Sequence, residues 1–429
     1  VLRRVVTWSF RNQGAKGLFE SEERIRALGV LALTQGQAVD ESHLPDALRQ
    51  RRNSVEARLH ELLRRSSRSS NLEQLKREYR LVCEEVEGYS LAQGLVRKAR
   101  PATLSSVQAS LLPGELMVEF VDLEQHRVAV LIQSQGSPVV VELGEISRLQ
   151  RFSQDGDSTT RLATLEGLGR SLWRPWADKV GPDIERLILI PTGSLYHVPL
   201  AAISLDNQPL IARYQVECAT SATSWMVSRR SPGRGQGALL AALGQANPQL
   251  SALPGTLQEV ARLKRVLPGA LTMLEHSMTR DNLRHQAAQV RWLHLATHGN
   301  LDPQEPLLGG LACADGMLTV ADIFRWRLQA EVVVLSACDS GRVNQQDGQE
   351  YVGLTQAFQC AGARSMLATL WSVSDQDTAV WMESLYRQLQ GGKTLGQATQ
   401  QATLSMRAQN ADPYLWAPFV IWGDGAVRL

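Results

Sequence analysis

The residues best suited to chemistry are a histidine and a cysteine that each close an apolar stretch of chain. His298 follows residues 290–297, and Cys338 follows the β-branched run 332–337. A free cysteine is only a few per cent thiolate at neutral pH, so a nucleophilic cysteine needs a base beside it. An imidazole can take the thiol proton and later protonate the leaving amine, which is worth about 10²–10⁴-fold in rate. We therefore predict that His298 and Cys338 form a catalytic dyad.

Such a dyad also needs hydrogen-bond donors for the negative oxygen of a tetrahedral intermediate. The backbone N–H groups of Gly299 and of Cys338 itself are the candidates. Losing one donor of this kind costs about 3 kcal/mol in comparable enzymes. Glycine suits position 299, because the missing side chain lets a substrate approach the backbone closely. The group that orients His298 is left open between Asp302, Asp339 and a backbone carbonyl.

The apolar stretches before His298 and Cys338 predict strands that are buried on both faces, as in a parallel sheet. In open α/β sheets, side chains at the carboxyl ends of such strands face the crevice where chemistry takes place. The 40 residues from His298 to Cys338 leave room for a loop, a helix and a return strand. We therefore expect the two strands to lie side by side.

Several other histidines and cysteines are predicted to be structural. His294 lies inside its strand and is expected to be a core residue with a hydrogen-bonded ring. Cys313 and Cys360 have no histidine beside them and are expected in the core, where cysteine behaves as a small apolar residue. His197 and Cys218 repeat the order histidine-then-cysteine, but neither ends a convincing apolar strand. The five cysteines include no CxxC pair, so neither a zinc site nor a disulfide framework is predicted.

Composition limits the possible classes of function. The chain has 429 residues, of which 44% are hydrophobic and 21% charged, as expected for a globular protein with two or three domains. A net charge of +2 gives no reason to expect a nucleic acid or membrane partner. No secretory leader and no apolar run near the roughly 20 residues of a membrane span are present. We expect a cytoplasmic location and no metal or cofactor.

The hydrophobic pattern divides the chain into three regions. Residues 1–105 have helical spacing, and the arginines at 49, 51 and 52 are expected to form a solvated helix face. Residues 106–231 begin with a predicted β-meander, and a Gly- and Pro-bearing linker over 230–237 follows. Residues 232–429 alternate strands and helices, which predicts an α/β three-layer sandwich with a mostly parallel six-stranded sheet. The strands expected there are 238–243, 270–274, 291–296, 331–337, 365–370 and 419–422.

From about residue 115 to its end, the chain resembles a CHAT domain, a bacterial relative of caspases and separase in peptidase clan CD. The motifs that carry the resemblance are His-Leu-Ala-Thr-His-Gly (294–299), Leu-Ser-Ala-Cys-Asp-Ser-Gly (335–341), Leu-Trp-Ser-Val-Ser-Asp (370–375) and Trp-Ala-Pro-Phe-Val-Ile-Trp-Gly (416–423). Upstream, Pro-Thr-Gly-Ser-Leu-Tyr-His-Val-Pro-Leu (191–200) resembles the family's segment in its first, inactive half.

This resemblance implies a caspase-like fold and a cysteine endopeptidase whose dyad is His298 and Cys338. It implies that residues 106–231 are an inactive caspase-like half and residues 232–429 the catalytic half. It also implies that residues 1–105 are the tail of a tetratricopeptide-like array, although no full 34-residue repeat is present. Family members make limited cuts in a protein substrate and depend on a protein activator or sensor module.

Substrate choice depends on the aspartates that follow the fifth strand. Separase-like members carry Leu-Trp-x-Val-x-Asp there, and the aspartate can receive a basic P1 side chain. The matching residue is Asp375, with Asp377 nearby, so an Arg or Lys preference is one interpretation. The other is that Asp375 caps a helix beginning near Gln376, where aspartate is favoured.

Two further functions compete with the endopeptidase. One is a CHAT-fold scaffold that binds a protein partner while its cysteine stays idle. The other is a Cys–His hydrolase that acts on small thioesters or amides and not on polypeptides. Retention of His298, Gly299 and Cys338 favours the endopeptidase, because a decayed relative is expected to lose one of them.

Overall fold

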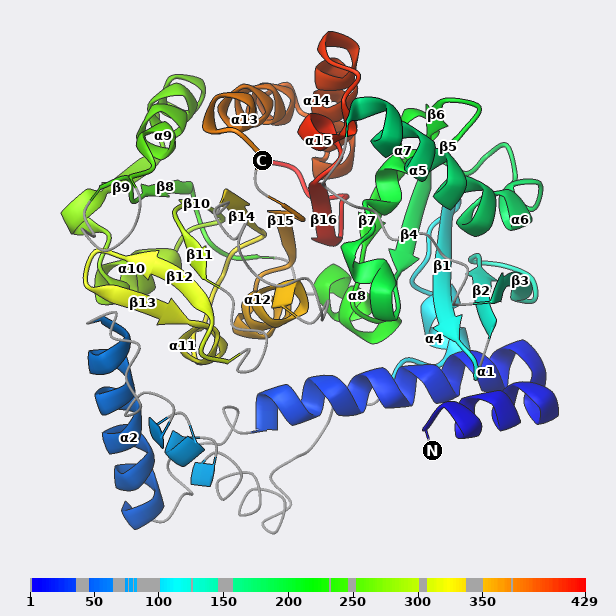
Figure 1. Cartoon of the computed structure of the whole chain (residues 1–429), viewed down its shortest axis with the longest axis horizontal. Coiled ribbons are helices and arrows are strands. Elements are labelled where there is room, and N and C mark those ends of the chain that lie inside the picture. The colour runs from blue at the N-terminus through cyan, green and yellow to red at the C-terminus, as the bar shows by residue number, and fades with distance from the viewer. Residues whose placement is uncertain are drawn as a thin grey trace.

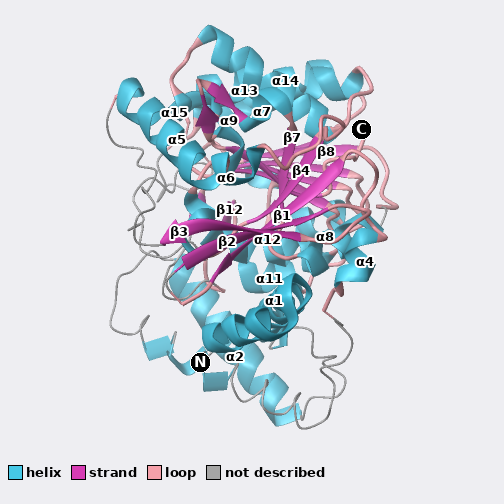
Figure 2. Ribbon diagram, turned by 90° about the vertical axis from the view of Figure 1, so that its right-hand side faces the viewer, coloured by secondary structure: helices cyan, strands magenta, loops and turns pink. Residues whose placement is uncertain are grey.

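An eleven-stranded sheet runs through the centre of the molecule and has helices on both faces (Figures 1 and 2). The computed structural model describes residues 2–35, 46–64, 74–75, 77–79, 81–82, 101–124, 126–145, 157–230, 233–245, 252–300, 307–336, 350–371 and 373–429. The strand order is β3-β2-β1-β4-β7-β16-β15-β14-β10-β8-β9. This three-layer α/β arrangement confirms the predicted fold class. No helix among the described residues is long and apolar enough to cross a membrane.

The six strands predicted within residues 232–429 are all present and adjacent in the sheet. We call them the second strand set. All except the edge strand β9 are buried along their length, because helices cover their apolar residues on both faces. All are parallel except the last, which pairs antiparallel with its neighbour. They are β8 (Ala238–Ala242), β9 (Leu271–Leu274), β10 (Trp292–Ala296), β14 (Val332–Ser336), β15 (Ser365–Thr369) and β16 (Phe419–Gly423).

Five more strands, the first strand set, extend this sheet. The β-meander expected near the start of the region is present as the antiparallel strands β1, β2 and β3. The last strand of this set, β7, begins two residues after the end of α7 (Leu210–Arg213). The two sets join where β7 pairs parallel with β16. The members of the first set are β1 (Glu115–Asp122), β2 (His126–Ile132), β3 (Val139–Glu145), β4 (Arg186–Ile190) and β7 (Gln215–Cys218).

The antiparallel pairing of β15 with β16 reverses the strand direction between the two sets. Strands β1, β4, β7 and β16 are mutually parallel, and they run opposite to β8, β9, β10, β14 and β15. The carboxyl ends of the parallel strands in the first set therefore lie at the opposite edge of the sheet from those in the second set. Carboxyl ends of parallel strands, where open α/β sheets hold their ligands, are therefore present at both edges.

Helices cover the two faces as separate layers (Figure 2). Residues 375–409 form two separate helices, because the first ends at Gln390 with Gly391 as its C-cap and Gly392 has a φ of 84°. On one face lie α5 (Ser158–Leu172), α6 (Arg174–Ala177), α7, α9 (Pro254–Val266), α13 (Asp375–Gln390), α14 (Leu395–Gln409) and α15 (Pro413–Trp416). On the other lie α1 (Leu2–Gln35), α4 (Leu104–Gln108), α8 (Ala222–Arg230), α11 (Val320–Phe324) and α12 (Glu350–Ala361).

A small three-stranded antiparallel sheet, not predicted from the sequence, lies between β10 and β14 in the chain. It consists of β11 (Gly299–Asn300), β12 (Gly310–Cys313) and β13 (Gly316–Thr319). Its strands have two to four residues, too short for a clear alternation of apolar and polar side chains. The dipeptide Asp315-Gly316 between apolar residues is the local signal that could have revealed the β12–β13 hairpin.

The helical N-terminal region includes α1 and α2 (Asp46–Arg64). The expected solvated arginine face is wrong for Arg52, which is only 2% exposed. Arg52 lies three residues before Val55 and so shares its helix face, and Val55 belongs to an apolar cluster with Leu308. This cluster attaches the helical region to the chain just before β12.

Helix α1 is held at the carboxyl edge of the first strand set. The Arg26 guanidinium donates hydrogen bonds to the carbonyls of Phe120 (2.9 Å), Pro191 (2.8 Å) and Thr220 (3.2 Å), at or just beyond the ends of β1, β4 and β7. Its Nε also lies 3.2 Å from a carboxylate oxygen of Glu119, which is fully buried. One side chain of α1 therefore bonds to the ends of three neighbouring strands at that edge.

We predict that Arg26→Met lowers the free energy of unfolding by about 3–5 kcal/mol, the usual effect of leaving a buried charge unpaired. Burial raises the pKa of Glu119, and Arg26 lowers it. The deficit should shrink at acidic pH, because a protonated Glu119 needs no cation. Urea denaturation measures both effects. Arg24→Met, on the exposed side of the same helix, is the matched control. An equal loss in both variants would contradict the prediction.

Candidate active site

The strands that precede His298 and Cys338 are neighbours, as predicted. β10 and β14 pair in parallel, and Ala296 is opposite Ser336 at the end of the register. His298 comes two residues after Ala296, and Cys338 comes two residues after Ser336. Cys338 lies outside the described residues, as do Asp302 and Asp339. The two strands therefore end at the same edge of the sheet, and His298 follows there directly after β10.

The small sheet fixes the backbone at His298. The Ala312 amide of β12 donates a 2.9 Å hydrogen bond to the His298 carbonyl. The Thr297 hydroxyl, itself fully buried, donates a 2.8 Å bond to the Ala312 carbonyl. His298 is only 8% exposed. Its backbone lies two residues beyond the end of β10 and is hydrogen-bonded to β12. The sequence analysis did not identify Thr297 as part of this arrangement.

The same ladder orients the amide of Gly299. In β11, Gly299 lies opposite Leu311 of β12. Because the flanking Ala312 amide bonds to the His298 carbonyl, the pair Gly299–Leu311 occupies a non-hydrogen-bonded position of the antiparallel ladder. At such a position the N–H group points away from the partner strand. The Gly299 amide is therefore directed away from β12.

His294 is a buried residue with a hydrogen-bonded ring, as predicted. Its Nδ1 lies 3.2 Å from the Tyr386 hydroxyl of α13, and its Nε2 lies 2.9 Å from Oε1 of Glu259 in α9. The other oxygen of Glu259 accepts a 2.9 Å hydrogen bond from the Ser336 hydroxyl. Burial raises the pKa of Tyr386, and the negative charge of Glu259 raises it further. Glu259 was not identified from the sequence, where it looks like an ordinary charged residue of a helix.

Two of the cysteines predicted to be structural are unsuited to nucleophilic chemistry. Cys218 and Cys313 are buried, and burial raises the pKa of both thiols, that of Cys313 to about 12. Both are therefore protonated at neutral pH. The expectation that Cys360 is in the core is wrong, because its position near the end of α12 leaves it exposed. Cys83 lies outside the described residues. His197 is half-buried at the end of the short 3-10 helix Gly193–His197.

The two aspartates considered for P1 recognition lie in the first turn of α13. The alternative that Asp375 caps this helix is wrong, because the N-cap is Ser374, whose hydroxyl accepts a 3.2 Å bond from the Asp377 amide. Asp375 instead caps α9, through a 3.1 Å bond from the Gly255 amide to its Oδ2. Helix α9 has no side-chain cap of its own at Leu253. Both aspartates are half-buried and take part in helix capping.

Gly255 permits the contact between α9 and α13. A Cβ atom at this position would lie 2.1 Å from Cβ of Asp375, far inside van der Waals contact. The first turns of the two helices can therefore approach this closely only when residue 255 is glycine.

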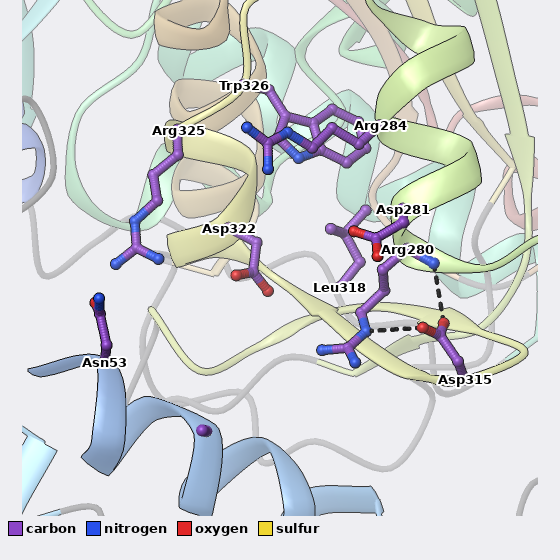
Figure 3. Close-up of a pocket in the computed structure, with 10 residues that line it drawn as sticks. Asn53, Arg280, Asp281, Arg284, Asp315, Leu318, Asp322, Arg325 and Trp326 are labelled. Atoms are coloured by element: carbon purple, nitrogen blue, oxygen red, sulfur yellow. Dashed lines mark hydrogen bonds and ion pairs between the residues drawn. The ribbon is translucent and has the colours of Figure 1, made fainter. Parts of the chain in front are cut away.

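A cavity of about 340 Å³ lies between α2 and the segment that contains α10 (Arg280–Ala287), the small sheet and α11 (Figure 3). Asn53 and Ala57 of α2 form one wall. The facing wall comes from α10, β13 and α11, and it carries three arginines and three aspartates. Arg280 and Asp315 pair within it, through a 2.9 Å bond from the Arg280 amide and a 3.3 Å bond from its Nε. The cavity contains none of the predicted site residues.

Comparison with known proteins adds information on family and fold. The model of the CHAT domain family matches residues 162–424. Tetratricopeptide repeat protein 28 from Homo sapiens is 24% identical over 298 residues, and the mouse protein of the same name is 24% identical over 299 residues. These matches cover 56% of this chain, and the chain spans only 12% of each relative's length.

Among solved structures, a crystal structure of the Saccharomyces cerevisiae separase–securin complex is similar in fold. The TM-score is 0.50 with 10% sequence identity, and the match covers 95% of this chain and 40% of that chain. At this identity the likeness concerns the fold alone. The large, mostly parallel sheet therefore matches the caspase-like fold of separase, and the helical region at the N-terminus accompanies it.

We predict that Cys218 and Cys313 stay unmodified when the native protein is treated with iodoacetamide at neutral pH. Their thiols are buried, and the raised pKa leaves almost no thiolate. Cys360 is exposed, but partial burial of its thiol raises the pKa to about 11, so it should be alkylated faster than these two cysteines and more slowly than a free thiol. Peptide mass mapping gives the extent of modification at each site, and treatment in urea is the control in which all five cysteines react. Rapid modification of Cys313 in the folded protein would contradict the burial described here.

Proposed function

The chain belongs to the CHAT domain family, and from that premise we propose that it is a cysteine endopeptidase with a dyad of His298 and Cys338. The observation that supports this most is the in-register pairing of β10 and β14. The two strands end at the same edge of the sheet, and in the sequence His298 and Cys338 each come two residues after the last paired residue, which supports a dyad there. That edge is where open α/β sheets hold their reactive groups.

The proposed reaction follows from the chemistry of the two side chains. His298 takes the thiol proton of Cys338, and the thiolate attacks the carbonyl carbon of the scissile peptide bond. The oxygen of the tetrahedral intermediate receives the N–H groups of Gly299 and Cys338. The Gly299 amide supports this role because it is directed away from β12. His298 then protonates the leaving amine and later activates the water that hydrolyses the thioester.

A preference for Arg or Lys at P1 is part of the proposal. Asp375 and Asp377 begin α13, five or more residues after β15, the parallel neighbour of β14. Asp375 caps α9, and Leu253 at the start of α9 bonds to the Gly244 carbonyl just beyond β8, which supports a position of the Asp375 carboxylate near the edge where β10 and β14 end. Asp375 is half-buried, which strengthens its interaction with a cation relative to a fully exposed group.

The third part of the proposal is that a protein activator or sensor module regulates the peptidase. The chain spans 12% of tetratricopeptide repeat protein 28, and the solved separase structure is a complex with securin. Leu308, just before β12, packs with Val55 of α2 and with Tyr79 and Val82 of the helical region. Since β12 holds the His298 carbonyl, a movement of the helical region would reach the site through this contact.

The test is cleavage of a positional peptide library by the wild type and by Cys338→Ala, with intact-mass detection of an acyloxymethyl ketone adduct. We expect turnover with Arg or Lys at P1 and a mass adduct on Cys338, both lost in the variant. Cys360→Ala is the control, because it removes an exposed cysteine and should change neither result. An adduct without turnover would indicate a competent site that awaits its activator. Absence of both would favour the alternative, a CHAT-fold scaffold with an idle cysteine.

We further predict that Asp375→Asn lowers kcat/KM for substrates with a basic P1 residue by about 30-fold or more, since losing one partner of a buried charge pair costs about 2–5 kcal/mol. Asparagine retains an oxygen that can accept the Gly255 amide, so the unfolding midpoint should change little. Steady-state kinetics with matched Arg and Leu substrates measure the effect. Asp157→Asn, at the N-cap of α5, is the control. Unchanged selectivity would remove Asp375 from the P1 pocket and leave the peptidase proposal intact.

A further inference from the structure

A buried polar network lies beneath the ends of the two site strands. Glu259 of α9 is its centre, and one of its carboxylate oxygens lies 2.9 Å from His294 of β10. The other accepts a 2.9 Å hydrogen bond from Ser336, the last residue of β14. Glu259, His294 and Ser336 are 3%, 1% and 6% exposed. A single carboxylate therefore bridges two neighbouring strands from outside the sheet.

A carboxylate in this position needs an explanation. Burying a charged group is costly unless partners compensate for the lost water, and a well-packed apolar residue is often equally stable. Ser336 is two residues before Cys338, and His294 is four residues before His298. The contacts of Glu259 are thus made at the last paired residue of β14 and close to the end of β10.

The helix that carries Glu259 is itself held in place. Asp375 of α13 caps the first turn of α9, and α13 also carries Tyr386, which contacts the far side of the His294 ring. The rings of His294 and Tyr386 meet edge to face at 5.7 Å. Because α9 and α13 are anchored to each other and to β10, the carboxylate has a defined position relative to both strands.

We propose that Glu259 is a positioning residue for the dyad, an inference that rests on the proposed function. Its carboxylate holds Ser336 and His294 at a fixed separation. This fixes the distance between the end of β14, which leads to Cys338, and the end of β10, which leads to His298. Proton transfer and thiolate attack depend on near-contact geometry, and a displacement of about 1 Å can cost 10²-fold in rate. Glu259 does not touch the substrate or exchange protons in the reaction.

The same two strands provide a matched control. Glu331, 7% exposed, precedes β14 and accepts hydrogen bonds of 2.9 and 2.6 Å from the guanidinium of Arg291, which precedes β10. This pair joins the strands at their amino ends, on the edge away from the site. Glu331→Gln therefore alters a buried carboxylate on the same strand pair without acting on the strand ends that lead to the dyad.

The experiment compares the wild type with Glu259→Gln and Glu331→Gln. Titration of Cys338 with an acyloxymethyl ketone gives the reactive fraction, the inactivation rate constant and the inhibition constant. For Glu259→Gln we expect a rate constant lower by about 10- to 100-fold, with the reactive fraction and inhibition constant unchanged. Hydrogen exchange, followed by mass spectrometry, should rise at the carboxyl ends of β10 and β14. Glu331→Gln should keep the wild-type rate constant and raise exchange at the amino ends.

The outcomes separate this inference from the proposed function. An adduct that forms on the wild type and at the same rate constant in Glu259→Gln would overturn the inference alone. An equal slowing in Glu331→Gln would also overturn it, because the effect would then be general to the strand pair. Absence of any adduct on the wild type would contradict the proposed function and remove the ground for this inference. If Glu259→Gln does not fold, Ser336→Ala, which removes one hydroxyl, serves for the same comparison.

Discussion

The site depends on the in-register parallel pairing of β10 with β14. Parallel strands need a crossover between them, and here that crossover contains the small sheet and α11. This crossover also fixes the backbone of the site, because β12 bonds to the His298 carbonyl and orients the amide of Gly299. Ladder hydrogen bonds fix the two strands relative to each other, and side-chain contacts fix the points where the chain leaves them. A change that slips this register by one residue would separate the groups that the proposed reaction needs.

The reversal between β15 and β16 places carboxyl ends of parallel strands at both edges of the sheet, and the two edges have different neighbours. At the carboxyl edge of the first strand set, Arg26 bonds to three carbonyls and Glu23 accepts the Ala222 and Thr223 amides that begin α8. Both side chains come from α1, so the protein's own helix occupies this edge. This occupation supports the proposal that only the second strand set is catalytic. It also means that the helical region is anchored to both sets, through α1 at one edge and through the cluster around Leu308 near the other.

Much of the fold could be predicted from the sequence, because apolar runs of about five residues are a strong local signal for buried parallel strands. The six strands of the second set and the adjacency of β10 and β14 follow from such runs. The contacts of single polar residues could not be predicted in this way. Glu259 lies between Gln258 and Val260 in an amphipathic helix, and its burial depends on where α9 packs. The cap that Asp375 provides is likewise made across two helices 120 residues apart, so local helix-capping rules assigned it to the wrong helix.

These unpredicted polar contacts form one continuous arrangement. Asp375 orders the first turn of α9, α9 carries Glu259, and Glu259 joins β10 to β14. Under the proposed function, Asp375 also faces the substrate, so the P1 pocket and the network beneath the dyad share one helix pair. A carboxylate with two oxygens can accept the Gly255 amide with one and a cationic side chain with the other. Recognition of the substrate and alignment of the reacting groups then depend on the same close contact between α9 and α13, which only a glycine at position 255 allows.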